Sequence, residues 1–75
     1  MDKKINDNIL TQREHETLIL LTKGFCNKKI ADELCVSIPT VKAHIESVYN
    51  KFGTHNKVEA VIFAIKSGIL KIDEI

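Results

Sequence analysis

The stretch KKIADELCVSIPTVKAHI, residues 28–45, contains two segments with helical spacing that are separated by only three residues, 35–37. Apolar residues recur at helical intervals on both sides of this joint, namely Ile30, Ala31, Leu34, Val41 and Ile45. A joint this short makes two helices cross steeply and pack closely, which the small side chain of Ala31 permits. Val41 would then hold the second helix against the first. The stretch therefore predicts a helix-turn-helix, whose second helix enters the major groove of DNA.

Capping signals extend this interpretation to an all-α fold, a four-helix domain with a central helix-turn-helix. Thr11 and Glu14 have the spacing of a capping box, and Gly24 is a suitable helix terminator. Ser37 is a good N-cap for the third helix, which is expected to end at Gly53. The four predicted helices cover about residues 11–24, 27–34, 38–52 and 56–68.

The second helix has a poorly capped start. Cys26 is a weak N-cap, and the cations Lys28 and Lys29 lie at the positive end of the helix dipole. Two interpretations remain open. Either Asn27 caps the helix and the lysines are simply solvated, or the free N–H groups and the two ammonium groups bind a phosphate.

The third helix has one apolar face and one face suited to reading bases. At 100° per residue, the apolar face consists of Val41, Ile45, Val48 and Phe52. On the other face Lys42 can donate to guanine or phosphate, Ala43 can contact a thymine methyl, and Glu46 can accept from cytosine N4. A solvated carboxylate is an equally good interpretation of Glu46. Contacts with the DNA backbone are expected from Ser37 and Thr40 at the start of the helix. They are also expected from four lysines, of which we expect two to make no contact: Lys28, Lys29, Lys51 and Lys57.

The fourth helix is apolar on nearly every side. One stripe is formed by Ala60, Val61 and Ala64, and a second, roughly opposite, by Val58, Ile62 and Ile65, with Ile69 just past the end. A surface helix needs only one apolar face. We therefore predict a homodimer through Val58, Ile62, Ile65 and Ile69. The alternative is that the tail, Ile69 to Ile75, folds back over this second stripe.

Composition excludes several other classes of protein. A chain of 75 residues is one small domain, and no apolar run reaches the length of a membrane span. We expect a soluble cytoplasmic protein with reduced thiols, because a helix separates Cys26 from Cys35 by roughly 13 Å. No catalytic, cofactor or metal-binding pattern is recognisable, so we predict no enzyme. The net charge of +1 is low for a nucleic-acid binder and does not by itself indicate one.

Several motifs together resemble the LuxR/GerE family of bacterial DNA-binding domains, which also form the C-terminus of NarL/FixJ-type response regulators. The matching residues are Leu10-Thr11-x-Arg13-Glu14-x-Glu16, Gly24-x-x-Asn27-Lys28-x-Ile30-Ala31, Leu34, Val36-Ser37, Thr40-Val41-Lys42-x-His44-Ile45, Lys51-Phe52-Gly53 and Ala60-Val61. The resemblance implies sequence-specific binding to duplex DNA through the third helix and dimerisation through the fourth. RNA polymerase is a further candidate partner. This chain departs from the family pattern at Cys26 and Lys29, where the family usually has Ser or Thr and Glu.

These observations predict a polar arm at residues 1–9, a LuxR-type domain at 10–70 and a tail at 71–75. The predicted function is a dimeric transcription regulator that binds a partly palindromic site, with residues 38–52 in the major groove. The alternative is a helical module that binds another regulator through residues 56–68 without reading DNA. Because the chain opens with Met1 and this arm, we expect either a stand-alone regulator similar to GerE or an excised effector domain.

Overall fold

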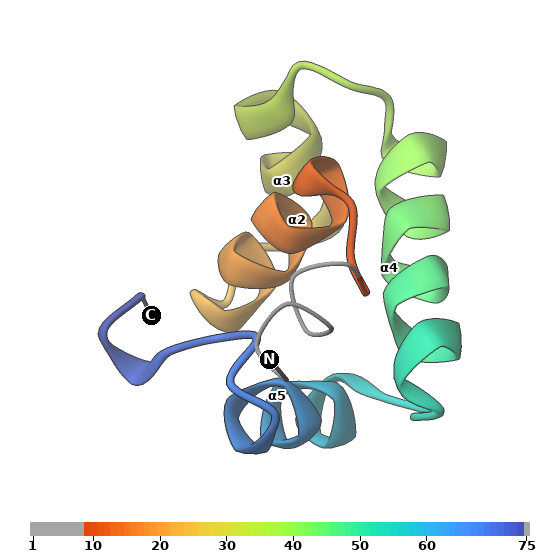
Figure 1. The fold of residues 1–75 in the computed structure, drawn as a ribbon. Helices are drawn as coiled ribbons and strands as arrows, with labels where there is room; N and C mark the ends of the chain where they lie inside the picture. The colour runs from red at the N-terminus through yellow and green to blue at the C-terminus, as the bar shows by residue number, and fades with distance from the viewer. Residues whose placement is uncertain (1–8, 75) are drawn as a thin grey trace.

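The computed structural model of the chain describes residues 9–74, which form four α-helices and a short 3₁₀ turn (Figure 1). The elements are α2 (Gln12–Thr22), α3 (Asn27–Leu34), α4 (Ile38–Phe52), α5 (Lys57–Lys66) and η1 (Ile72–Glu74). The described residues contain no strand, which confirms the predicted all-α fold with its helix-turn-helix, α3 and α4. Of the predicted N-terminal arm, only Ile9 lies within the described residues.

The helix boundaries follow the predicted caps. Thr11 and Glu14 form a complete capping box at the start of α2, and Ser37 caps α4. Asn56 caps α5 through its side chain, which accepts from the Glu59 backbone N–H at 3.0 Å. The helix α5 ends at Lys66, two residues earlier than predicted, because the chain turns there into a left-handed glycine, Gly68.

The start of α3 settles one of the open interpretations. Cys26 is the N-cap and its side chain makes no capping hydrogen bond, while Asn27 is already the first helical residue. The idea that Asn27 caps this helix is therefore wrong. The backbone N–H groups of the first turn of α3 have no side-chain cap.

Two groups of buried side chains form the core, and α4 contributes to both. Val41 packs with Leu21, Ile30, Ala31 and Leu34. Further along α4, Val48 and Phe52 pack with Leu10, Leu18, Ala60, Ala64, Ile69 and Leu70. The helix α4 runs along one side of the domain and contacts α2, α3 and α5 (Figure 1). Its buried face is thus fixed at both ends, and its opposite face points away from the domain.

The chain after α5 folds back as far as residue 70, which corrects part of the predicted dimer surface. The backbone N–H groups of Ile69 and Leu70 both donate to the Ala64 carbonyl, and both side chains enter the core. Ile69 is only 9% exposed, so it packs within its own chain and is unavailable as a dimer contact. Ile69 and Leu70 thus pack in the core with Ala60 and Ala64, whereas Val58 and Ile62 of the second stripe stay exposed, so the tail does not cover that stripe as the alternative required.

Candidate nucleic-acid interface

The turn between α3 and α4 is made by a residue in the left-handed conformation. Cys35 has φ 58° and ψ 44°, and it is the one non-glycine residue with positive φ in the described chain. The backbone N–H of Val36 donates to the Ala31 carbonyl at 3.0 Å, which closes the end of α3. Glycine adopts this conformation without strain, whereas a residue with a Cβ pays a steric cost. The turn is nevertheless formed, and it directs the chain into α4 within three residues.

The first turn of α4 is held by two hydroxyl groups. The Ser37 Oγ accepts from the Thr40 backbone N–H at 3.2 Å and lies 2.9 Å from the Thr40 Oγ1. Pro39 occupies the first turn, where no backbone donor is needed. Both hydroxyls lie at the start of the helix, where sequence analysis expected contacts with phosphate.

The outer face of α4 carries the predicted base-reading residues. Lys42, Ala43 and Glu46 are all exposed, whereas Val41 and Val48 on the opposite face are buried. Lys42 and Glu46 are four residues apart, yet no ion pair joins them within the described chain; the same spacing does pair Lys28 with Asp32 and Lys29 with Glu33. The donor and the acceptor on this face are therefore not engaged with each other. The helical pattern did not single out one exposed residue of α4, Ile38 at the first helical position.

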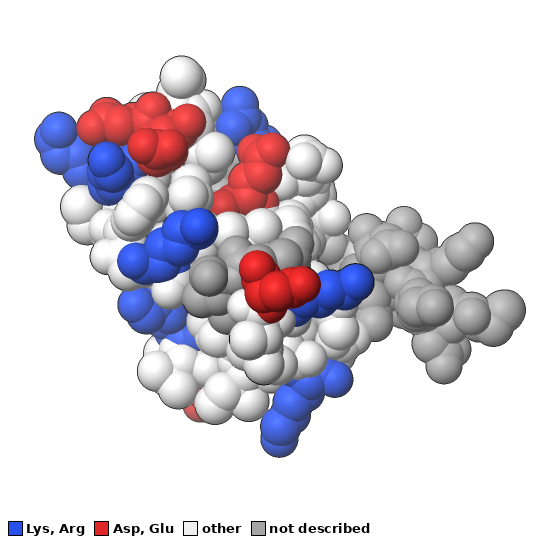
Figure 2. Space-filling model, turned by 90° about the vertical axis from the view of Figure 1, so that its left-hand side faces the viewer, with Lys and Arg blue, Asp and Glu red and all other residues white. Residues whose placement is uncertain are grey.

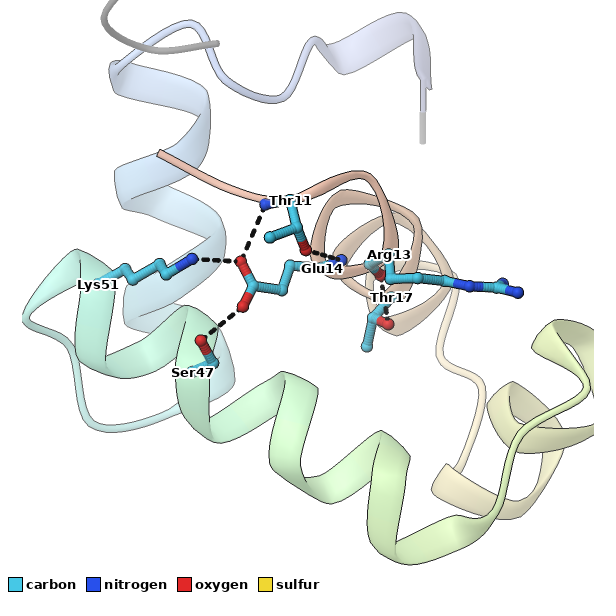
Figure 3. Close-up of polar contacts among 6 residues, drawn as sticks. All are labelled: Thr11, Arg13, Glu14, Thr17, Ser47 and Lys51. Carbon is cyan, nitrogen blue, oxygen red and sulfur yellow. Dashed lines mark hydrogen bonds and ion pairs between the residues drawn. The ribbon is translucent and has the colours of Figure 1, made fainter. Parts of the chain in front are cut away.

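A buried carboxylate links α2 to the C-terminal half of α4 (Figure 3). Glu14 is 6% exposed, and its Oε1 accepts from the Lys51 Nζ at 2.7 Å and from the Thr11 backbone N–H at 3.0 Å. Its Oε2 accepts from the Ser47 Oγ at 2.5 Å. Ser47 and Lys51 are one turn apart on α4, so a single side chain holds two successive turns of the helix against α2.

This network sets the charge state of Glu14. Burial raises the pKa of the carboxyl, but the hydrogen bonds from Lys51, Ser47 and Thr11, together with the charge of Lys51, outweigh burial and lower the pKa from its ordinary 4.5 to about 2. Glu14 is therefore an anion at neutral pH. The capping box indicated its bond to Thr11, but no local pattern points to partners 33 and 37 residues away.

The lysines predicted to contact phosphate lie in different environments. The Lys28 Nζ lies 3.8 Å from Asp32 and the Lys29 Nζ lies 3.9 Å from Glu33, in exposed pairs that water screens. The Lys29 ammonium also lies 5.5 Å from the centre of the Phe25 ring. Lys51 donates to buried Glu14, so it has a structural role that the sequence did not indicate. These contacts leave Lys28 and Lys29 freer than Lys51 to meet a phosphate.

The fourth of these lysines, Lys57, lies beside the predicted dimer residues. Lys57 begins α5 and lines a shallow hollow together with Thr22 of α2 and with Val58, Val61 and Ile62. Val58 is 63% exposed and Ile62 is 48% exposed, whereas Ile65 is half-buried against the core. The apolar surface available on α5 is therefore centred on Val58 and Ile62.

Charge on the side opposite α4 is mixed. Figure 2 views the domain from that side, and it shows Lys and Arg residues interspersed with Asp and Glu residues around uncharged surface. The charged residues visible on this face form no patch of a single sign. Among the described residues, no group of three or more His, Cys, Asp or Glu side chains could hold a metal ion. None of the helices in this described part of the chain has the length and apolar character needed to span a membrane.

Comparison with known proteins decides the family. Residues 8–64, more than half of the 75-residue chain, match the luxR family of bacterial regulatory proteins. The chain belongs to the luxR family of bacterial regulatory proteins. The LuxR/GerE resemblance drawn from the motifs is thus confirmed, and the helix-turn-helix of α3 and α4 is the helix-turn-helix of a luxR-family domain.

Several curated regulatory proteins resemble the chain over most of its length. The transcriptional regulatory protein YdfI of Bacillus subtilis (strain 168) is 44% identical over 73 residues, which are 97% of this chain and 34% of YdfI. The transcriptional regulatory protein DegU of Brevibacillus brevis is 38% identical over 65 residues, 87% of this chain and 28% of DegU. The oxygen regulatory protein NreC of Staphylococcus aureus (strain JH9) is 44% identical over 63 residues, 84% of this chain and 29% of NreC. The chain spans about a third of the length of these relatives.

Proposed function

We propose that this luxR-family domain binds double-stranded DNA sequence-specifically and regulates transcription as a dimer, with α4 in the major groove. The observation that carries the proposal is the outward face of α4, where Lys42, Ala43 and Glu46 are exposed on a helix whose other face is buried. A helix presented in this way fits the major groove, where its side chains meet base edges. The names of the relatives describe regulatory proteins, which supports the same function.

Each residue of the proposed interface has a distinct role. Lys42 donates to guanine or phosphate, Ala43 contacts a thymine methyl, and Glu46 accepts from cytosine N4. The start of α4 and the basic residues position the helix on the backbone: Ser37, Thr40, Lys28, Lys29, Lys51 and Lys57. Because Lys51 is paired with Glu14 at 2.7 Å, we expect it to contribute less to phosphate binding than Lys28 or Lys29.

Lys42→Ala tests the reading face. We expect the variant to lose sequence-specific retardation of a preferred duplex while its circular dichroism stays that of the wild type, because Lys42 is exposed and takes no part in the core. Lys23→Ala is the matched control, since it removes the same charge from the end of α2. Binding by Lys42→Ala that equals the wild type would remove Lys42 from the proposed reading face.

The proposed dimer uses Val58 and Ile62 of α5, with Ile65 at its edge. Two copies joined there would bind two half-sites about one helical turn apart and gain avidity, which suits a domain with a net charge of only +1. Ile62→Glu places a charge in this surface, and we expect sedimentation to show a shift toward monomer. Ile72→Glu is the control, because Ile72 is exposed in the tail outside α5. An equal mass for the wild type and Ile62→Glu would disprove the α5 interface.

The same exposed surface on α5 supports a second candidate function, a module that binds another regulator without reading DNA. Salt separates the two. Binding to DNA releases counterions from phosphates, so its affinity falls steeply as salt is raised, whereas an apolar protein contact is much less sensitive. A titration of binding to a preferred duplex across a range of salt concentrations should show the steep slope if the first proposal is correct.

A further inference from the structure

One apolar side chain lies at the tip of the helix that we propose reads DNA. Ile38 is the first residue of α4 and is 39% exposed. The other large exposed hydrophobic residues of the described chain lie elsewhere, Val58 and Ile62 on α5 and Ile72 in the tail. Neither group of core residues includes Ile38, even at its partly buried edge. Ile38 therefore lies outside both core groups, with part of its side chain open to solvent.

Ile38 is aligned with two residues of the reading face. Residues four apart on a helix differ by about 40° in direction, so Lys42 lies about 40° and Glu46 about 80° around the helix from Ile38, and the three form a slanted stripe about 12 Å long at the edge of the reading face. All three are exposed. The stripe presents an apolar group, a donor and an acceptor in that order. The N-terminal residues of a recognition helix are the ones that contact base edges, and Ile38 is the most N-terminal of the three.

The side chain is also held in place. An isoleucine in a helix has one strongly preferred χ1 rotamer. The next residue is Pro39, whose ring fixes its own backbone φ. The Ser37 Oγ, which accepts from the Thr40 backbone N–H at 3.2 Å, closes the same turn. Little conformational freedom remains to be lost when Ile38 meets a ligand, so even a small apolar contact would contribute to affinity.

We propose that Ile38 is a specificity-determining residue that contacts the C5-methyl group of a thymine, at the end of the half-site where α4 begins. The thymine methyl is the apolar group that base pairs present in the major groove, and an apolar side chain is its natural partner. The proposal rests on the proposed function, because it requires α4 to lie in that groove. It adds a thymine to the half-site beyond the one expected for Ala43.

The test removes the apolar group from each partner, the C5-methyl from the thymine and the carbons beyond Cβ from Ile38. A preferred duplex is first selected from a random pool with the full 75-residue chain, and each thymine in it is then replaced singly by deoxyuridine, which lacks only the C5-methyl. At one thymine we expect the replacement to weaken wild-type binding about fourfold, the equivalent of one buried methyl group at about 0.8 kcal/mol. The dissociation constants are measured for the wild type and for Ile38→Ala on both duplexes.

The proposal requires coupling between the two changes. At that thymine, Ile38→Ala should bind the thymine and deoxyuridine duplexes equally, whereas the control Ile72→Ala should keep the fourfold preference. A thymine contacted by Ala43 would instead keep its preference in Ile38→Ala. Ile38→Val, which retains a β-branched side chain, should keep part of the effect and serves as the second variant if Ile38→Ala does not fold by circular dichroism.

The outcomes separate this inference from the function on which it rests. If a preferred duplex is selected but no thymine methyl couples to Ile38, or if the duplex lacks thymine at the corresponding end, the contact is disproved and DNA reading stands. If no sequence is enriched at all, the proposed function fails and this inference fails with it.

Discussion

Replacing Glu14 by Gln should cost this domain a large part of its stability, and the structure gives the size of the effect. The carboxylate is buried and accepts hydrogen bonds from Lys51, Ser47 and the Thr11 backbone N–H. A pKa lowered from 4.5 to about 2 corresponds to about 3 kcal/mol, at about 1.4 kcal/mol for each tenfold change in proton affinity. Because solvent reaches the Lys51 side chain and screens its charge, we expect Glu14→Gln to lower the free energy of unfolding by about 2–3 kcal/mol.

The assay is urea unfolding followed by far-ultraviolet circular dichroism. A domain of this length is expected to have a total stability of roughly 4–11 kcal/mol, so the variant should remain folded and its transition measurable. The m-value should not change, because the same surface is exposed on unfolding. Glu16→Gln is the matched control. Its carboxylate pairs with Arg13 at 3.3 Å on the surface, where such a pair contributes at most about 1 kcal/mol.

The pH dependence gives an independent measure of the same contribution. The folded-state pKa of Glu14 lies below its unfolded value of 4.5, so the stabilisation is complete above about pH 5 and is lost as the pH falls toward about 2. The difference in stability between the wild type and Glu14→Gln should therefore shrink over that interval. A constant difference between pH 5 and pH 2, or a loss below about 1 kcal/mol at neutral pH, would refute the role assigned to this network.

Two further substitutions test the turn and the tail. Cys35→Gly should stabilise the domain by about 0.5–1 kcal/mol, since glycine relieves the steric cost of φ 58° but adds freedom to the unfolded chain; Cys35→Ala, which keeps the Cβ, should give no such gain in the same urea assay. Leu70→Ala should destabilise by about 2–4 kcal/mol because Leu70 is buried in the core, whereas Ile72→Ala, at an exposed position of the tail, should change stability by less than about 0.5 kcal/mol. Equal thermal or urea midpoints for these last two variants would show that the tail does not complete the core.

Much of the fold is local and could be predicted before the structure was known. Helix caps act over only three or four residues, so the residue types alone are enough to place the helix ends. This holds for the capping box of Thr11 and Glu14, the cap at Ser37 and the glycine at Gly53. The 3.6-residue period likewise predicted that Val41 and Val48 are buried and that Lys42 and Glu46 are exposed, because a helix of known phase has only one face to turn inward.

The interactions that no local pattern reveals join residues far apart in the chain. The sequence pattern predicts only a capping role for Glu14. The packing of α2 on α4 is what brings it to Ser47 and Lys51. Ile69 looked like one more apolar residue of an open stripe on the fourth helix, yet the turn at Gly68 carries it into the core. Period and capping act within one helix, whereas these contacts depend on how the helices cross. Local patterning therefore determined which helices form and which faces they bury, and the three-dimensional packing decided which charges meet and which apolar residues stay exposed.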